Sequence, residues 1–164
     1  MANLFEPDFD ESSEQPGFSW RRAMLARQAG GERLGASLFA LAPGEAVYPL
    51  HYHLGNEELL LVIDGSPSLR TADGERLLER GEVVSFPRGD AGAHQVVNRS
   101  GAEARVLLVS EMNSPEVVVR PESGKLSAMG RPPGDRGEGM HQIFFERNGA
   151  PFWEGEDPPP PAAE

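Results

Sequence analysis

The chain has 164 residues and a formal net charge of −11, and it contains no cysteine. This length suits one domain with a single core. The acidic balance disfavours nucleic acids and anionic lipid surfaces as partners, because their phosphate groups repel a protein of the same sign. Without cysteine the chain has no disulfide bonds, no thiolate metal ligands and no cysteine nucleophile.

The first 17 residues are polar and acidic, and we expect a flexible acidic segment there. They lack the basic start and the following apolar run of a signal peptide. The longest apolar run, residues 59–63, is far shorter than a membrane span. We therefore expect a cytoplasmic protein with no membrane partner.

Short apolar runs separated by turn signals fill the chain from residue 18 to residue 147, which predicts many strands rather than long helices. Asp73-Gly74 is a strong hairpin signal, since a type I′ turn needs φ > 0 at both central positions. Closely spaced strands of this kind predict an all-β sandwich or barrel. The strands are expected at about 20–28, 34–42, 46–53, 57–64, 67–71, 75–79, 82–86, 93–98, 104–111, 116–120 and 140–147.

Three segments have other features. Residues 21–29 have some helical propensity, although we expect a strand there. Residues 130–139 (GRPPGDRGEG) are predicted to form a loop within the barrel domain, and the sequence assigns that loop no role. Residues 148–164 end in EDPPPPAAE and are predicted to form a solvated C-terminal tail.

Two expected strands are apolar on both faces, namely residues 59–63 (LLLVI) and residues 106–109 (VLLV). A strand with one face in water would alternate polar and apolar residues, so both faces must be covered. One face would line the barrel interior. The other would pack on terminal segments or on a second subunit, because a wide exposed aliphatic patch is unusual on a monomer. We therefore expect a homodimer.

A pair of histidines carries the first sign of chemistry. His51 and His53 are two residues apart, so on a strand both side chains point to the same face. A hairpin after Gly55-Asn56 would bring a glutamate, Glu57 or Glu58, from the next strand to that face. Two imidazoles and a carboxylate suit a divalent transition metal ion such as Fe, Mn, Ni or Zn.

Two further histidines remain in the sequence. His94 lies in a later expected strand and is able to supply a third imidazole. His141 lies apart from these residues, and we expect it to be a surface or interface residue.

The spacing of these residues resembles the two sequence motifs of the cupin superfamily. The first motif is matched by Gly44, His51, His53, Glu58 and Gly65, and the second by Gly81, Pro87, Gly89, His94 and Asn98. The resemblance covers about residues 34–111 and implies a double-stranded β-helix, a jelly-roll-like barrel. It also implies that His51, His53, Glu58 and His94 bind one divalent metal ion, with Glu58 favoured over Glu57 by its distance from Gly65.

Two departures from the usual pattern are visible. Gly44 stands one residue further from His51 than is usual. The second motif has two additional residues in the segment 90–93, before His94. We expect this insertion to lengthen a loop at the mouth of the barrel.

The resemblance leaves two classes of function open. One is a metal-dependent enzyme, an oxygenase or isomerase acting on a small organic substrate, and the other is a non-catalytic cupin module that binds a small ligand. If Glu58 and His94 face inward, the expected lining is a metal ion and an aliphatic wall, with no catalytic residue that we are able to name. A sugar-phosphate isomerase is disfavoured, because no basic cluster accompanies the motifs. An acid, base or arginine close to the metal would favour an enzyme.

Overall fold

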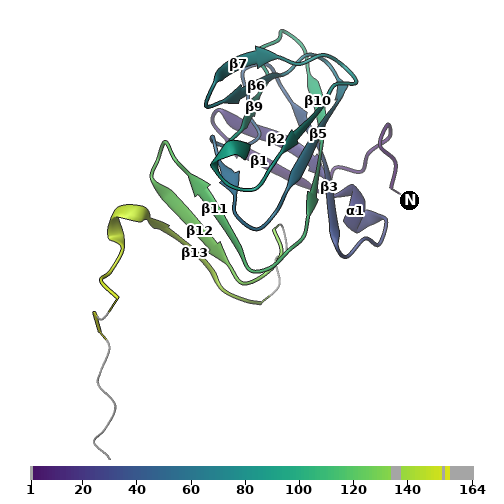
Figure 1. Ribbon diagram of the computed structural model, residues 1–164. Coiled ribbons are helices and arrows are strands. Elements are labelled where there is room, and N and C mark those ends of the chain that lie inside the picture. Colours follow the sequence, from purple (N-terminus) through teal and green to yellow (C-terminus); the bar gives the residue numbers. More distant parts are fainter. Residues whose placement is uncertain (1, 134–137, 153, 156–164) are drawn as a thin grey trace, which may run out of the picture.

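Antiparallel strands make up most of the molecule (Figure 1). The computed structural model describes residues 2–133, 138–152 and 154–155. The strands are β1 (Glu11–Gln15), β2 (Phe18–Ala23), β3 (Leu34–Leu41), β4 (Tyr52–His53), β5 (Glu58–Asp64), β6 (Ser68–Thr71), β7 (Gly74–Leu77), β8 (Val83–Phe86), β9 (Gln95–Val97), β10 (Ala104–Glu111), β11 (Glu116–Arg120), β12 (Lys125–Met129) and β13 (His141–Phe145). The helices are single turns: α1 (Leu25–Gln28), η1 (Asp90–Gly92) and η2 (Glu146–Asn148).

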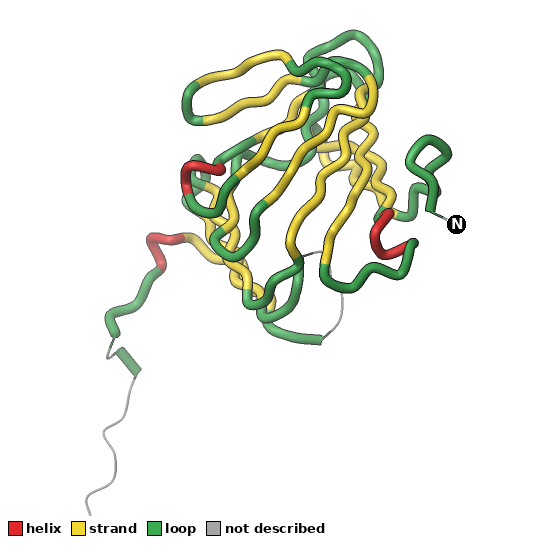
Figure 2. Tube along the Cα trace, turned by 45° about the vertical axis from the view of Figure 1, so that its right-hand side comes forward, coloured by secondary structure: helices red, strands yellow, loops and turns green. Residues whose placement is uncertain are grey.

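The strands form three sheets that curve around a common interior (Figure 2). The largest has the order β1-β2-β3-β10-β5-β8, the second β13-β12-β11-β4 and the third β7-β6-β9. In Figure 1 the β6–β7 hairpin lies at the top, and the sheet of β11, β12 and β13 lies at the lower left. The all-β jelly-roll architecture predicted from the sequence is confirmed.

Strand alternation places the core. On β5 the side chains of Leu60 and Val62 are buried, whereas Leu59 and Leu61 point to the other face. The buried apolar cluster draws on most strands of the barrel and consists of Phe39, Leu41, Val47, Leu60, Val62, Leu69, Leu78, Phe86, Val96, Val106 and Leu108. It fills one half of the barrel interior and leaves the other half to polar side chains.

The outer face of the large sheet is covered unevenly. Leu38 on β3 is fully buried where α1 packs against that strand. Leu59 on β5 is 39% exposed. The homodimer expected from the apolar outer face stays a prediction.

Two expected strands differ from the structure. Residues 20–28 form a strand only as far as Ala23, and α1 follows, because Leu-Ala-Arg-Gln consists of good helix formers that close one turn. Within residues 46–53 only Tyr52 and His53 belong to a strand. Pro49 has no N–H to donate, and Ala46 and His51 make only isolated bridges.

Two strands occur where none was expected. β1 lies within the acidic segment 1–17 and pairs along its whole length with β2, where Glu11 forms an ion pair with Arg22. β12 pairs with β11 after a turn in which Gly124 has φ of +60°. Both strands complete hairpins, and partners of this kind stabilise polar sequences that lack a clear apolar alternation.

The C-terminal part of the chain is only partly described. The predicted loop at 130–139 includes residues 134–137, which lie outside the described residues, as do Trp153 and residues 156–164 of the predicted tail. Within the described ranges, no helix is long and apolar enough to cross a membrane.

Candidate metal centre

Three short segments bring four side chains together. His51 and His94 form an isolated antiparallel bridge, in which each backbone N–H donates to the carbonyl of the other, at 3.1 and 2.9 Å. His53 lies in β4, and Glu58 is the first residue of β5. The side chains therefore come from backbone segments held by strand pairing, which limits their freedom to move.

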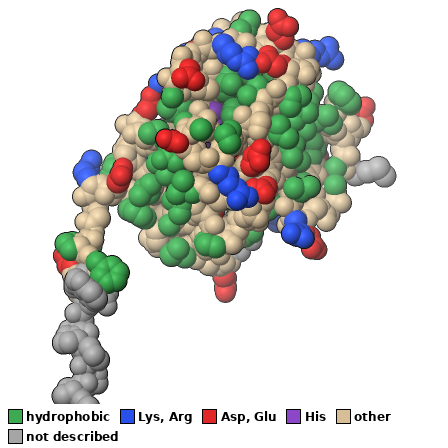
Figure 3. Space-filling model, viewed as in Figure 1, with side chains coloured by type: hydrophobic (Ala, Val, Ile, Leu, Met, Phe, Trp, Pro, Cys, Tyr) green, Lys and Arg blue, Asp and Glu red, His purple; other side chains and the backbone are tan. Residues whose placement is uncertain are grey.

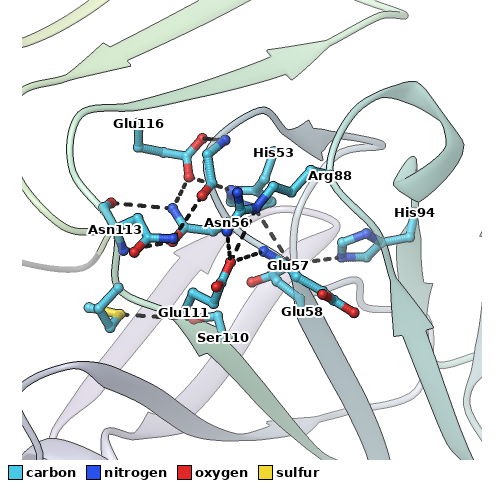
Figure 4. Close-up of polar contacts among 12 residues, drawn as sticks. His53, Asn56, Glu57, Glu58, Arg88, His94, Ser110, Glu111, Asn113 and Glu116 are labelled. Carbon is cyan, nitrogen blue, oxygen red and sulfur yellow. Dashed lines mark hydrogen bonds and ion pairs between the residues drawn. The ribbon is translucent and has the colours of Figure 1, made fainter.

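The ligand atoms of these residues lie close together. Those of His51, His53 and Glu58 all lie within 4.8 Å of one another. The Nε2 atoms of His53 and His94 lie 3.5 and 3.4 Å from Oε2 of Glu58. Figure 4 shows the ring of His94 turned toward Glu58. The structure thus groups His51, His53 and Glu58, and it places His94 next to Glu58 but outside the set whose ligand atoms all lie within 4.8 Å of one another.

Backbone carbonyls orient two of the imidazoles. The Nδ1–H of His51 donates to the carbonyl of Pro49 at 2.8 Å, and that of His94 donates to Gly92 at 2.9 Å. A neutral imidazole that donates through Nδ1 has a free electron pair on Nε2, and the Nε2 atom of His94 faces Glu58. This arrangement is typical of histidines that bind metal ions.

The carboxylate of Glu58 has a buried oxygen without a hydrogen-bond partner, and Nδ1 of His53 also lacks a partner. The Glu58 side chain is only 13% exposed, and its Oε2 is the buried oxygen. Burying a carboxylate oxygen without a partner is costly. A cation between Glu58 and the three imidazoles would satisfy this oxygen, so the residues present fit a divalent metal ion with nitrogen and oxygen ligands.

Glu116 lies next to Nδ1 of His53, the ring nitrogen on the side away from Glu58. It is 1% exposed, and its Oε2 lies 3.6 Å from Nδ1 of His53, an ion-pair distance rather than a hydrogen bond. Asn56 donates its side-chain N–H to Glu116, and the N–H of Gly55 donates to it at 3.2 Å. This carboxylate is therefore fixed in place, and it holds the ring of His53 with Nε2 toward Glu58.

The protonation of His51 and His94 suits metal binding, whereas the pKa shifts of His53 and Glu58 favour their protonated forms. Burial, with the neighbouring histidines, holds the pKa of His51 well below its ordinary value, and burial lowers the pKa of His94 to about 4. Both rings are thus neutral at pH 7. Burial would also lower the pKa of His53, but the nearby carboxylates of Glu116 and Glu58 raise it. Burial raises the pKa of Glu58, an effect that a bound cation would oppose.

A pocket of about 420 Å³ opens from this cluster. His51, His53 and Glu58 line it, together with Tyr48 and with side chains from β2, β3, β10 and β11. The prediction of an aliphatic wall with few further acids or bases missed Arg22 and Arg120, which also line this space. Strand alternation places residues 116, 118 and 120 on one face of β11, but it does not indicate that this face lies beside His53.

The other candidate residues lie elsewhere. Glu57 is exposed on the opposite face of β5, where it accepts a hydrogen bond from Ser85 at 3.1 Å. His141 is exposed on β13, and its Nδ1 lies 3.4 Å from the guanidinium of Arg131. Asn98 is buried and donates to the carbonyls of Leu41 and Ala102, so its role is structural. In Figure 3 only a small histidine area (purple) reaches this face of the molecule.

The two-residue insertion before His94 forms η1. A side chain at Gly92 would place its Cβ 1.8 Å from the carbonyl oxygen of Pro87, so only glycine fits this close approach. The inserted residues thus fold against the preceding proline, and His94 still points to the inside of the barrel.

Comparisons with known proteins agree with this architecture. Residues 37–110 match the family described as "Cupin domain". The tetracenomycin polyketide synthase protein TcmJ of Streptomyces glaucescens is 38% identical over 84 residues, which is 51% of this chain and 52% of that protein. The chain therefore spans about half the length of this curated relative.

Two solved structures have the same fold. A sugar phosphate isomerase of the cupin superfamily from Silicibacter pomeroyi DSS-3 has a TM-score of 0.75 and 24% identity, over 90% of this chain and 94% of that one. A putative sugar phosphate isomerase from Acidithiobacillus ferrooxidans ATCC 23270 has a TM-score of 0.72 and 22% identity, over 84% and 83%. The chain therefore matches a cupin domain over residues 37–110 and shares the fold of these two solved structures.

Proposed function

We propose that the chain binds one divalent transition metal ion through His51, His53, Glu58 and His94, and that it is a metal-dependent enzyme for a small organic substrate. The observation that carries this proposal is the buried, unpartnered Oε2 of Glu58, which faces two imidazole Nε2 atoms at 3.4 and 3.5 Å. Without a cation, this oxygen stays buried without a hydrogen-bond partner, which costs stability.

A bound ion would supply a Lewis acid or a redox centre at the base of the pocket. The chain itself supplies groups that bind and orient. Tyr48 lines the pocket and accepts a hydrogen bond from Arg22 at 3.3 Å, and burial raises the pKa of its hydroxyl. The phenol therefore keeps its proton at pH 7 and is able to donate it in a hydrogen bond to a substrate oxygen.

For this enzyme we propose oxygenase or isomerase chemistry. The proteins of similar fold include sugar phosphate isomerases, and the relative from Streptomyces glaucescens is named as part of a polyketide synthase. These names support small organic substrates. The presence of Arg22 and Arg120 in the pocket removes the reason for which a phosphorylated substrate was disfavoured.

The alternative is a non-catalytic cupin module that binds a small ligand at the same site. An aliphatic lining would have favoured it. Tyr48, Arg22 and Arg120 beside the cluster favour the enzyme instead, because chemistry needs polar groups within reach of the substrate.

Turnover by the metal-loaded protein tests the proposal. Protein purified without chelator would be loaded separately with Fe, Mn, Ni and Zn. Each sample would then be incubated with small acids, phenols and sugar phosphates, once in air and once under anaerobic conditions. Mass spectrometry would follow the products. We expect one metal and one compound class to give product. The His53→Ala variant should give no product. The His141→Ala variant, which changes an exposed histidine outside the pocket, should turn over normally. Binding without turnover for every compound would favour the non-catalytic module.

A further inference from the structure

One side chain of the pocket wall carries a charge that the metal cluster does not use. Arg120 ends β11, lies on the same face of that strand as Val118, and lines the pocket with His51, His53 and Glu58. It is half-buried. Its Nη1 donates to the buried hydroxyl of Ser127 at 2.6 Å, which fixes the direction of the guanidinium.

Arg120 has no acidic partner among the residues that the structure describes. Arg22, the other arginine close to the cluster, is paired with Glu11. Several arginines on the outer surface are also paired, as in the ion pairs of Arg70 with Glu122 and of Arg99 with Glu75. Burial lowers the pKa of Arg120, and no carboxylate offsets this cost.

The charges of the loaded site would not cancel. The carboxylates of Glu58 and Glu116 would balance a divalent ion, and Glu11 balances Arg22. The positive charge of Arg120 is then left over. A half-buried site with one uncompensated positive charge attracts an anion.

Much of the remaining wall is apolar and adaptable, although two serines and the side chains of Arg27 and Glu32, whose formal charges offset each other, also line the pocket. Met24, Met112 and Met129 line the pocket, together with Leu34 and Leu108. Methionine side chains are flexible and polarizable, and they adapt to apolar or aromatic groups of different shape. The pocket therefore combines one anion-binding guanidinium with an apolar surface.

We propose that the substrate is an organic oxyanion with an apolar body, and that Arg120 binds its anionic group while the rest of the molecule lies between the methionines and the metal. This inference rests on the proposed metal site. A guanidinium binds carboxylate and phosphate oxygens with two parallel hydrogen bonds, so either anion fits its geometry.

Calorimetric titration of the metal-loaded protein tests the inference. The probes are phenylacetate, phenyl phosphate and the neutral phenylacetamide, measured on the parent and on Arg120→Gln, Arg120→Lys and Arg80→Gln. Arg80 is an exposed arginine outside the pocket and serves as the matched control. The parent should bind one of the anions at least about tenfold more tightly than the amide, which corresponds to one charged hydrogen bond. Comparing the two anions separates a carboxylate from a phosphate substrate.

Arg120→Gln should remove this preference, Arg120→Lys should keep part of it, and Arg80→Gln should leave it unchanged. A preference that survives Arg120→Gln would mean that the metal alone selects the anion, and it would overturn the inference. Equal binding of anions and amide, or no binding of any probe, would also overturn it. Metal content is measured on each sample, so failure to hold metal in the parent would refute the proposed function instead.

Discussion

The two ends of the barrel interior differ sharply although the same strands build both. On the inner face of β5, Glu58 stands at the open end, and Leu60 and Val62 follow toward the closed end. On the segment leading into β9, His94 is likewise followed by Val96. Residues i, i+2 and i+4 of a strand share one face, so a polar residue of the site and apolar residues of the core lie next to each other on that face.

The two halves contribute to the protein in opposite ways. The packed half removes apolar surface from water, which stabilises the fold. The polar half buries a carboxylate oxygen without a partner and an arginine without an acid among the described residues, both of which cost stability. We infer that the packed half positions the polar half and offsets its cost. Four substitutions test separately what the packed half and the polar half contribute to stability and to metal binding.

The largest effect is expected in the packed half. Leu60 is fully buried in the apolar cluster, so Leu60→Ala removes packing and leaves a cavity. The free energy of unfolding of the metal-free protein should fall by about 2–5 kcal/mol. Urea denaturation measures this change. The variant should still bind one metal ion per folded chain, and loss of metal binding in the folded variant would show that the halves are not separable.

A pH-dependent effect is expected from His94. Burial lowers its pKa from 6.5 to about 4, so between these values the unfolded chain holds a proton that the folded chain does not. The stability contributed by neutral His94 is fully present above pH 6.5 and is lost as the pH falls toward 4, by about 3 kcal/mol in total.

Denaturation of the metal-free protein at several pH values, compared with His94→Gln, isolates this contribution. The comparison is needed because burial shifts the pKa of Glu58 upward, which changes stability with the opposite sign. The parent should lose more stability than the variant between pH 6.5 and pH 4.5. Parallel curves would contradict the buried neutral state of His94.

A smaller effect is expected from the group behind His53. Glu116→Gln keeps the shape of the side chain but removes the charge that faces Nδ1 of His53. Metal affinity should fall about tenfold, as for other residues that orient a metal-binding histidine. Competition with a chelator of known affinity measures this change. Glu57→Gln, which alters an exposed glutamate on the opposite face of β5, should leave the affinity unchanged.

The smallest effect is expected from Glu58 itself in the absence of metal. The buried carboxylate costs stability at pH 7 because its pKa is raised by burial. Glu58→Gln should therefore raise the free energy of unfolding of the metal-free protein by roughly 1 kcal/mol. The same substitution should weaken metal binding. A variant that loses stability under these conditions would show that the carboxylate has a structural partner.

Much of the difference between the polar and the apolar half of the barrel interior was predictable from the sequence. The spacing of His51, His53, Glu58 and His94 was enough to predict which side chains meet, because strand alternation and a known motif both constrain it. The strands expected at 57–64 and 104–111, around the apolar runs 59–63 and 106–109, agree closely with β5 and β10.

The remaining parts of the site depend on contacts between distant segments. The role of Glu116 requires β11 to lie beside β4, with Val118 opposite His53, and neither periodicity nor composition predicts that pairing. Arg120 was overlooked for the same reason. The segment 46–53 was predicted as a strand from its residues, but Pro49 and the single bridge at His51 leave it mostly irregular. That irregular backbone supplies the carbonyl that orients His51.

Metal stoichiometry tests the central claim most directly. Metal-free protein would be titrated with Ni²⁺ and with Mn²⁺ in a calorimeter, alongside the double variant His51→Ala/His53→Ala and the control His141→Ala. We expect one site per chain in the parent and in His141→Ala, and no site in the double variant. Absence of binding by the folded parent, or equal binding by the double variant, would contradict a metal site at these residues.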